Sequence, residues 1–432
     1  MKILIIGNGG REHALAYGIY NSKSFKESAS VIYVTIGNPG INKLCTPIDI
    51  KPTDIGNLIK FAKKEKIDLT VVGPEIPLAM GIVDEFEKNK LKIFGPDKKS
   101  AEIESSKIFT KNLLQKYGIP TAKYKVFNSD NTATAISYIA TINYPVVIKA
   151  DGLAAGKGVI IAGNKEEAGK AIKDLTEEAI FGEAGRSFVI EEFLSGYELS
   201  LFVITDGINY VCLPYSQDHK KIGEGDTGKN TGGMGAYAPA DKLMDDILHE
   251  KIEEKIIKPV LKAMDIEGRK YKGCLYCGLM ICGNPGGEME PYVIEFNCRF
   301  GDPEAQAVIP LVKSDFLEML MCSAEGRIKE YKLEVKNKYA CCVVLASAGY
   351  PDNYETGKII SGLDNTDCPV FHSGTKEKGV NVITNGGRVL SVVGLSVSTM
   401  AEAIRNSYRN VAGINFENKY YRKDIAKKYT TI

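Results

Sequence analysis

Short apolar runs alternate with amphipathic stretches along the first hundred residues. The apolar runs are rich in β-branched residues, as strands are, and cover residues 2–6, 31–35, 69–72 and 91–94. Between them, residues 55–66 and 78–89 carry apolar side chains three and four positions apart, the spacing of an amphipathic helix. This alternation predicts βαβ units that form a parallel sheet.

Glycine-bearing turns follow three of these predicted strands, at residues 7–10, 37–40 and 73–75. Because ligands of parallel sheets bind at the carboxyl ends of the strands, the three turns predict one shared pocket. The first turn reads GNGGREH and stands between a strand and a helix, where backbone N–H groups and the positive helix end suit a phosphate. A tight turn without a ligand remains the alternative for this motif.

A dinucleotide fingerprint fits this first turn poorly. Gly-x-Gly-x-x-Gly counted from Gly7 requires glycine at the position of Glu12. The second strand also lacks the acidic residue at its end that would hold a ribose. A small phosphate-bearing ligand, with Arg11 as an additional cation, is the better hypothesis.

The middle of the chain has a different order of elements. A predicted helix at 105–118 is followed by strand, glycine turn, strand, helix and strand, at residues 144–150, 151–158, 159–162, 165–175 and 188–194. The polar, glycine-rich stretch 215–239 is too long for a connector, so it is either functional or disordered. Residues 274–297 read as a hairpin, and the chain from 329 reads as a third, smaller α/β unit.

Composition narrows the class of protein. A chain of 432 residues is long enough for about three domains. Its net charge of +1 provides no general field for nucleic acid or membranes, and no apolar run approaches the ~20 residues of a membrane helix. The ten cysteines are scattered, which favours reduced, packed thiols and a cytoplasmic location.

The glycine turn at 151–158 has lysines at both ends, Lys149 before it and Lys157 within it. Glycines such as Gly156 and Gly158 let main-chain amides close over phosphate oxygens, and lysines neutralise the charge. The order of residues is not that of a Walker A loop. The pattern predicts a hairpin-like flap over ATP, with an exposed surface turn as the alternative.

A candidate nucleoside site follows the flap. The strand that ends in Glu191, Glu192, Phe193 and Leu194 offers backbone groups to an adenine edge. Glu198, a few residues on, is an acid suited to ribose hydroxyls. Taken alone, the same pattern describes a half-buried strand with solvated acids.

The most specific pattern is VIEFNCRFGDPE. In a strand, residues two apart share a face, so Glu295, Asn297 and Arg299 should project together while Phe296 and Cys298 enter the core. A carboxylate beside an amide oxygen suits Mg²⁺, and a neighbouring arginine can stabilise a transferring phosphoryl group. A surface stripe of ion pairs is the alternative, but it does not explain why the run ends in a Gly-Asp-Pro-Glu turn.

In this order, the motifs resemble the ATP-grasp superfamily and, within it, the glycinamide ribonucleotide synthetase (phosphoribosylamine–glycine ligase) family. The resemblance runs from residue 7 to residue 390 and is carried by GNGGREHALA, VVGPE, KIFGP, SKIFTK, IKADGLAAGKGV, SQDHKK, DTGKNTGGMGAY, VIEFNCRFGDPE, FHSGT and TNGGRVL. SQDHKK together with NTGGMGAY is the most specific pair.

The resemblance implies an α/β, ATP-grasp fold in three parts. An N-terminal parallel-sheet (pre-ATP-grasp) domain is expected over residues 1–104. The ATP-grasp domain is expected over 105–328, with a mobile flap subdomain at about 122–191, and a small C-terminal α/β domain over 329–432. Larger organisms fuse this activity to neighbouring purine enzymes, whereas this chain stops after YRKDIAKKYTTI, so a monofunctional protein is expected. A monomer is also expected.

The implied reaction joins glycine to 5-phosphoribosylamine in purine biosynthesis. ATP first phosphorylates the glycine carboxylate, and the sugar amine then displaces phosphate from glycyl phosphate. The expected cofactors are ATP and Mg²⁺ or Mn²⁺. The expected partners are these small molecules, with no nucleic acid and no membrane. Such chemistry requires positioning and charge neutralisation instead of a protein nucleophile.

The resemblance also assigns roles to matching positions. Asp218, Lys220 and Arg299 are expected to be catalytic, and Glu295 and Asn297 to bind the metal. The residues expected to bind ATP are Lys107, Lys149, Gly156, Lys157, Gly158, Glu191, Glu192, Phe193, Leu194 and Glu198. The residues expected to bind phosphoribosylamine are Gly9, Gly10, Arg11, Glu12, Asn38, Gly40, Gly73, Pro74 and Glu75.

Two rival interpretations remain. Another ATP-grasp carboxylate ligase, biotin carboxylase-like or formate-using, should lack the pair SQDHKK and NTGGMGAY. A nucleotide-binding regulatory protein should have lost Glu295, Asn297 or the flap lysines, all of which are present. The predicted strand with Gly278 and Met280 has no acidic ligand, so a second metal held entirely by the protein is not expected.

Overall fold

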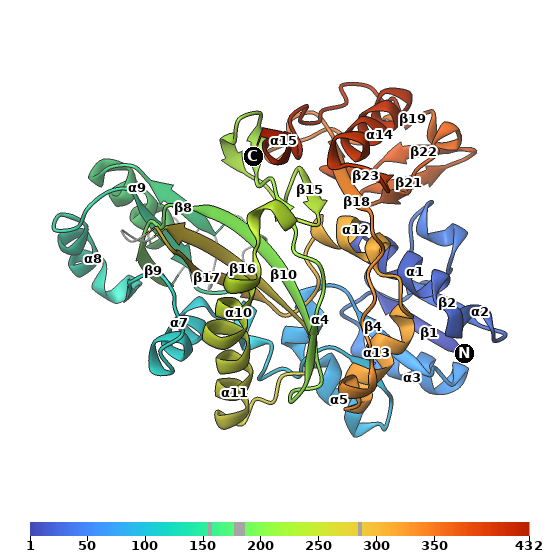
Figure 1. Cartoon of the computed structure of the whole chain (residues 1–432), viewed down its shortest axis with the longest axis horizontal. Coiled ribbons are helices and arrows are strands. Elements are labelled where there is room, and N and C mark those ends of the chain that lie inside the picture. The colour runs from blue at the N-terminus through green and yellow to red at the C-terminus, as the bar shows by residue number, and fades with distance from the viewer. Residues whose placement is uncertain (154–157, 177–185, 284–286, 432) are drawn as a thin grey trace.

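The computed structural model describes residues 1–153, 158–176, 186–283 and 287–431. Figure 1 shows the N-terminal and C-terminal segments together on one side of the molecule, with a central sheet beside them and a small subdomain projecting at the opposite end. Gly156 and Lys157, which were expected in the flap, lie outside the described residues.

The N-terminal segment forms the predicted parallel sheet. Its strands lie in the order β3-β2-β1-β4-β5 and all pair in parallel. They are β1 (Lys2–Ile6), β2 (Val31–Thr35), β3 (Thr46–Ile48), β4 (Leu69–Val72) and β5 (Ile93–Phe94). The helices around them are α1 (Gly10–Asn21), α2 (Lys23–Lys26), α3 (Ile55–Glu65), α4 (Glu75–Met80) and α5 (Ile82–Lys88). Strand order reverses beside β1, so the turns after β1 and β4 lie at a switch point, where such sheets bind ligands.

The projecting subdomain has an antiparallel sheet and its own core. The sheet order is β6-β9-β7-β8, and helices α8 (Thr132–Ile139) and α9 (Lys165–Thr176) belong to the same subdomain (Figure 1). The strands are β6 (Tyr124–Asn128), β7 (Val146–Ala150), β8 (Val159–Ala162) and β9 (Ser187–Glu192). Its buried cluster, which includes Phe127, Ile148 and Phe188, is separate from the other two cores. The subdomain can therefore keep its packing if it moves as a unit.

The central sheet carries the predicted hairpin. Its order is β11-β10-β16-β17, with neighbouring strands antiparallel. The strands are β10 (Tyr197–Thr205), β11 (Tyr210–Cys212), β16 (Gly273–Gly283) and β17 (Met289–Asn297). The helices of this region are α6 (Glu102–Ser105), α7 (Lys107–Lys116), α10 (Asp246–Ile252), α11 (Lys258–Ile266), α12 (Glu304–Val308) and α13 (Phe316–Glu325).

The glycine-rich stretch 215–239 is ordered and joins the C-terminal sheet. It forms β12 (Gln217–Asp218), β13 (Lys221–Gly223), β14 (Thr227–Asn230) and β15 (Gly235–Ala238). The C-terminal sheet has the order β12-β15-β18-β23-β20, so two strands of the stretch complete it. Its other strands are β18 (Tyr339–Ala346), β20 (Val370–His372) and β23 (Arg388–Ser396), and the final helices are α14 (Met400–Gly413) and α15 (Lys427–Thr431). A separate small sheet contains β19 (Ile359–Ile360), β21 (Thr375–Lys378) and β22 (Asn381–Thr384).

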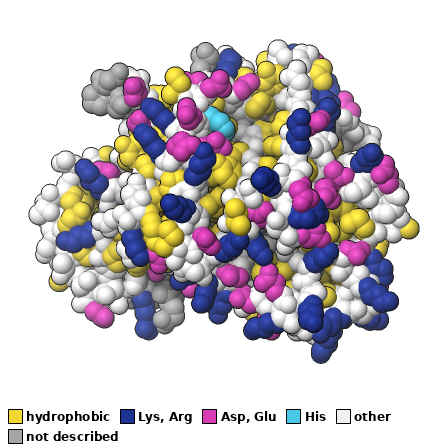
Figure 2. Space-filling model, turned by 60° about the horizontal axis from the view of Figure 1, so that its bottom comes forward, with side chains coloured by type: hydrophobic (Ala, Val, Ile, Leu, Met, Phe, Trp, Pro, Cys, Tyr) yellow, Lys and Arg dark blue, Asp and Glu magenta, His cyan; other side chains and the backbone are white. Residues whose placement is uncertain are grey.

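Charges of both signs are mixed over the surface. Figure 2 shows basic and acidic side chains interspersed on the visible face, in agreement with the net charge of +1. No helix in the described part of the chain is long and apolar enough to cross a membrane. The ten cysteines are free thiols, and all except Cys212, Cys282 and Cys368 are buried.

The backbones of the N-terminal unit and the central sheet come close together at Gly95 and Gly273. Gly273 has φ +108°, and a Cβ added there would lie 2.9 Å from the Cα of Gly95. We expect Gly273→Ala to lower the stability by about 2–4 kcal/mol, because backbone strain adds to the clash between two backbones. The urea midpoint of unfolding measures the loss.

Gly268→Ala is the matched control for this prediction. Gly268 also has a left-handed backbone, with φ +69°, but a Cβ there would meet no atom within 4 Å. Gly268→Ala should lower the stability only by the strain of the left-handed backbone, about 1–2 kcal/mol. Equal shifts of the midpoint in both variants would contradict the role assigned to the contact between Gly273 and Gly95.

Candidate active site

A cavity of about 840 Å³ lies where the three parts of the fold meet. Arg11 and Glu75 reach it from the N-terminal sheet, and Arg388 reaches it from the C-terminal sheet. The remaining lining residues come mainly from α6–α7, the projecting subdomain, the central sheet with the segment that follows β17, and the glycine-rich stretch, and Lys428 of the C-terminal segment also lines the cavity. Most of the residues expected at the site therefore share one cavity. These are Arg11, Glu75, Lys107, Lys149, Gly158, Glu191, Glu192, Phe193, Leu194, Glu198, Asp218, Lys220, Glu295, Asn297 and Arg299.

Two buried lysines converge on Glu191 at one end of the cavity. Lys111 Nζ and Lys149 Nζ each lie 3.0 Å from Glu191 Oε2. Lys149 also donates to the carbonyl of Ile294, and Lys111 to the hydroxyl of Thr121. Burial lowers the pKa of Lys111 to about 8, although Glu191 opposes this effect. Glu191 Oε1 has no partner among the described residues, which leaves one buried acceptor in the cavity wall.

The start of α7 places Lys107 beside the flap strand. Ser106 caps the helix by accepting a hydrogen bond from the N–H of Phe109 at 3.0 Å. Asp151, which begins the glycine turn after β7, accepts from the Ser106 hydroxyl at 3.0 Å and from the N–H of Ile108 at 3.1 Å. The helix start and the flap turn are thus joined, and Lys107 lines the cavity between them.

Strand β17 has the predicted alternation. Phe296 and Cys298 are buried in the core, whereas Glu295, Asn297 and Arg299 line the cavity. Burial would raise the pKa of Glu295, but Lys220, Lys107 and Lys149 lower it to about 2, so the carboxylate is ionised near neutral pH. When the Asn297 amide is assigned by its hydrogen bonds, its nitrogen donates to Phe296 O and Glu104 Oε1. Its oxygen then remains for a cation beside Glu295.

Arg299 joins this strand to the N-terminal unit. Its Nε lies 3.3 Å from Glu75 Oε2, and its Nη2 lies 2.8 Å from Glu104 Oε1. Burial alone would lower the pKa of Arg299, but Glu104 and Glu75 outweigh it and raise the pKa, so the guanidinium stays charged. Glu104 also accepts from the N–H of Cys298 at 2.7 Å. One buried acid thus fixes both the end of β17 and its arginine.

Lys220 lies between two predicted ligand-binding acids. Its Nζ is 3.0 Å from Glu198 and 3.6 Å from Glu295. Burial, together with the charge of Glu304, raises the pKa of Asp218 well above its usual range. Glu304 is itself buried and accepts from the Ser200 hydroxyl at 3.2 Å. Asp218 can therefore take up or release a proton, and Lys220 can change its ion-pair partner, when a substrate enters this part of the cavity.

The remaining N-terminal candidates lie behind Arg11 and Glu75 and do not line the cavity. Gly9 donates its N–H to Glu12 at 2.6 Å, closing the start of α1, and Asn38 accepts from the N–H of Gly40 at 3.0 Å. Their binding of phosphoribosylamine stays a prediction. The residues in this position are Gly9, Gly10, Glu12, Asn38, Gly40, Gly73 and Pro74.

Sequence reasoning missed several charged residues of the site, among them Glu104, Lys111, Glu304 and Arg388. Lys111 had a detectable signal, since it follows Lys107 by four residues on one predicted helix and therefore shares its face. Arg388 donates through Nη1 to the carbonyls of Gly232 and Asp302. No local pattern indicates that contact, because the partners are distant in sequence.

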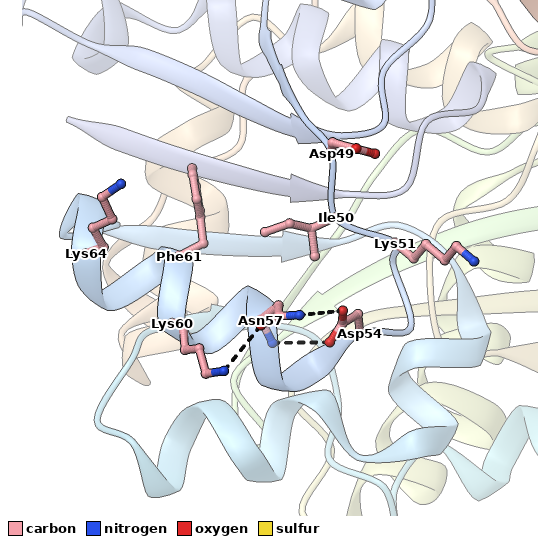
Figure 3. Close-up of a pocket in the computed structure, with 8 residues that line it drawn as sticks. All are labelled: Asp49, Ile50, Lys51, Asp54, Asn57, Lys60, Phe61 and Lys64. Carbon is pink, nitrogen blue, oxygen red and sulfur yellow. Dashed lines mark hydrogen bonds between the residues drawn. The ribbon is translucent and has the colours of Figure 1, made fainter.

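A second cavity, of about 540 Å³, lies on the N-terminal unit between the end of β3 and α3 (Figure 3). Asp54 caps α3 there by accepting from the N–H of Asn57 at 3.2 Å, and Lys60 donates to the Asn57 side chain. Its charged side chains, Asp49, Lys51, Asp54, Lys60 and Lys64, are exposed. Exposed charges of both signs are screened by solvent, so this groove does not compete with the central cavity as a candidate site.

Models of phosphoribosylglycinamide synthetase match nearly the whole chain. The N-domain model covers residues 1–104, the ATP-grasp (A) domain model 105–305 and the C-domain model 340–428. The chain belongs to the phosphoribosylglycinamide synthetase family. The resemblance and the ATP-grasp fold inferred from sequence are therefore confirmed.

Individual relatives agree over their full lengths. A phosphoribosylamine–glycine ligase of Caldanaerobacter subterraneus subsp. tengcongensis is 46% identical over 430 residues, covering 99% of this chain and 100% of the relative. That of Escherichia coli K12 is 46% identical, covering 98% of both. The crystal structure of the Thermotoga maritima ligase superposes with a TM-score of 0.84 at 34% identity, covering 99% of this chain and 100% of that one.

A more distant structure shares only the fold. Biotin carboxylase from Campylobacter jejuni superposes with a TM-score of 0.72 at 16% identity, covering 100% of this chain and 95% of that one. This likeness supports the ATP-grasp architecture and carries no information about the substrate.

The buried pair between Glu104 and Arg299 yields a stability prediction. Glu104→Gln should destabilise the protein by about 3–5 kcal/mol, because it leaves a buried guanidinium short of a counter-charge. Glu102→Gln is the control, since Glu102 lies on the same helix but pairs with Arg269 at the surface. It should cost about 0–1 kcal/mol. Urea unfolding of both variants measures the difference, and similar midpoints would refute the buried pair.

Proposed function

We propose that the protein ligates glycine to 5-phosphoribosylamine through glycyl phosphate, with release of ADP and phosphate. Family membership and full-length relatives named phosphoribosylamine–glycine ligase support an ATP-dependent ligase of purine biosynthesis. The observation that carries the proposal is the central cavity, where basic residues, a carboxylate–amide pair, and Arg11 and Glu75 of the N-terminal unit meet.

The nucleotide would bind between the flap and the central sheet. Glu191 to Leu194 would face the adenine and Glu198 the ribose, with Lys107 and Lys149 on the phosphates. The glycines and Lys157 of the flap turn would close over them. Lys149 is held by Glu191 in this structure, so phosphate oxygens would replace or share that partner when ATP binds.

Glu295 and Asn297 would hold Mg²⁺ or Mn²⁺, with phosphate oxygens and water as the other ligands. The ionised carboxylate and the free amide oxygen fit a hard cation. The metal would neutralise charge on the transferring phosphoryl group. Lys220, which pairs with Glu295 at 3.6 Å, would then move toward the phosphates or the glycine carboxylate.

Arg299, Asp218 and Lys220 would orient the reacting groups. A glycine carboxylate oxygen attacks the γ-phosphorus, the bond to ADP breaks, and glycyl phosphate forms beside the Arg299 guanidinium. The sugar amine then attacks the acyl carbon, phosphate leaves, and the nitrogen loses a proton. Arg11 and Glu75 stand between this point and the N-terminal turns that would hold phosphoribosylamine.

The proposal includes the domain layout 1–104, 105–328 and 329–432, and a monomeric protein. Each substrate would be bound by a different part of the chain, since the nucleotide residues lie in the ATP-grasp part and the acceptor residues in the N-terminal part.

The first test is substrate dependence. Purified protein with ATP and Mg²⁺ should release ADP rapidly only when glycine and freshly generated phosphoribosylamine are both present, because the second step regenerates free enzyme. A coupled assay for ADP measures the rate. ADP release that does not depend on the sugar amine would contradict the assignment of phosphoribosylamine as the acceptor and, with it, the proposed N-terminal binding site.

The metal assignment is tested by Glu295→Gln. This variant should bind ADP at least about tenfold more weakly in Mg²⁺. Without metal, its affinity should equal or exceed that of the wild type, since a negative charge near the phosphates is removed. Glu290→Gln lies on the same strand and pairs with Lys251 and Lys255 instead, so it should behave as wild type. Calorimetry with and without Mg²⁺ gives both affinities. Equal effects of the two variants would refute the site.

A further inference from the structure

The end of the chain folds back over the hairpin of the glycine-rich stretch. Figure 1 shows α15 and the C-terminus beside the yellow-green segment that carries β13 and β14. The contacts between residues 420–431 and this hairpin involve side chains that the proposed mechanism does not use.

Arg422 is the centre of these contacts. Its side chain has 0% exposure, and two of its nitrogens form a fork on Asp424 at 2.7 Å each. Its third nitrogen, Nη1, donates to the carbonyl of Lys221 at 3.0 Å and to Asp226 at 2.9 Å. Asp424 in turn accepts from the N–H of Gly225 at 2.8 Å. A fully buried guanidinium is therefore bound on both sides, to the C-terminal segment and to the hairpin.

Two neighbouring contacts extend the attachment along the stretch. The Tyr420 hydroxyl donates to the carbonyl of Ile222 at 2.7 Å. The N–H of Ala426 donates to His219 Nε2 at 3.3 Å. Burial, with Arg422 nearby, lowers the pKa of His219 to about 4, so the ring is neutral and can accept this bond near neutral pH.

His219 stands between Asp218 and Lys220, the two candidate catalytic residues of the stretch. Its backbone is fixed as well, because its N–H donates to Gly235 O at 2.9 Å and its carbonyl accepts from Met234 N–H at 2.9 Å. The C-terminal segment thus holds the stretch at the border of the cavity, which Asp226 and Lys428 line together with Asp218 and Lys220.

We propose that Arg422 is a positioning residue for the glycine-activating step: it fixes the β13–β14 hairpin to the C-terminal segment and so holds Asp218 and Lys220 in place. This rests on the function proposed above. Arg422 touches no substrate and acts only through the hairpin. Removing it should therefore impair the use of glycine and leave nucleotide binding, which depends on the flap and β17, unchanged.

Two variants cut the attachment from opposite sides. Arg422→Ala removes the buried guanidinium. Asp226→Gly removes its partner on the hairpin, and glycine accepts the left-handed backbone of that position, φ +58°, without strain. Asp352→Asn is the matched control, because it breaks an exposed ion pair with Lys229 of the same hairpin. The side chains of Asp352 and Lys229 are 62% and 68% exposed.

The experiment combines kinetics with hydrogen exchange on the full chain. Arg422→Ala and Asp226→Gly should lower kcat/KM for glycine by about a hundredfold, the effect of a small misplacement of catalytic groups. Their affinity for MgADP should stay at the wild-type value, and amide exchange should rise within residues 215–239 and not in the flap. Added methylguanidinium should partly restore the glycine activity of Arg422→Ala. Asp352→Asn should match the wild type in kcat/KM, MgADP affinity and amide exchange.

The outcomes separate this inference from the proposed function. A wild-type protein without glycine-dependent ADP release refutes the function, while the exchange data still test the attachment. Unchanged exchange in 215–239 refutes the positioning role. Loss of MgADP affinity in parallel with glycine activity also refutes it and indicates a general loss of structure. If Arg422→Ala does not fold, Asp226→Gly provides the same tests, because the pair between Arg422 and Asp424 remains intact.

Discussion

The buried ion pairs of Arg299 with Glu75 and Glu104 are the interaction on which the active site depends. Arg299 follows shortly after β17, Glu75 begins α4 at the switch point of the N-terminal sheet, and Glu104 lies on α6 and pairs with the same arginine. Buried charges are unfavourable unless each has a well-placed partner. These three groups therefore define how the N-terminal unit meets the central sheet.

The same requirement governs the rest of the cavity. Glu191 is paired with Lys111 and Lys149, and Lys220 with Glu198 and Glu295. Phosphates and a metal ion would offer these groups equivalent partners. The site can therefore exchange one set of ion pairs for another without leaving a charge uncompensated in a low-dielectric interior. Catalysis by positioning and charge neutralisation requires such a preorganised set.

The C-terminal part of the chain constrains the glycine-rich stretch 215–239 as well as covering the site. Strands β12 and β15 of the glycine-rich stretch complete its sheet, and Arg388 and Arg422 fix the stretch at two further points. A stretch rich in glycine loses much conformational entropy on ordering. Contacts from the C-terminal sheet and the final segment supply the free energy that orders it.

Local pattern was sufficient for the parallel sheet, the hairpin of β16 and β17, and the shared face of Glu295, Asn297 and Arg299. Side-chain direction in a strand and strand–helix alternation depend on near neighbours in sequence, so the sequence alone determined them. The roles of Glu104, Glu304 and Arg388 were decided by tertiary structure, because their partners lie far along the chain. The same holds for Asn38, whose side-chain amide donates to the carbonyls of Asn8 and His372. A side chain's partner, and hence its charge state and availability to a ligand, is set by packing between distant segments, which no local pattern records.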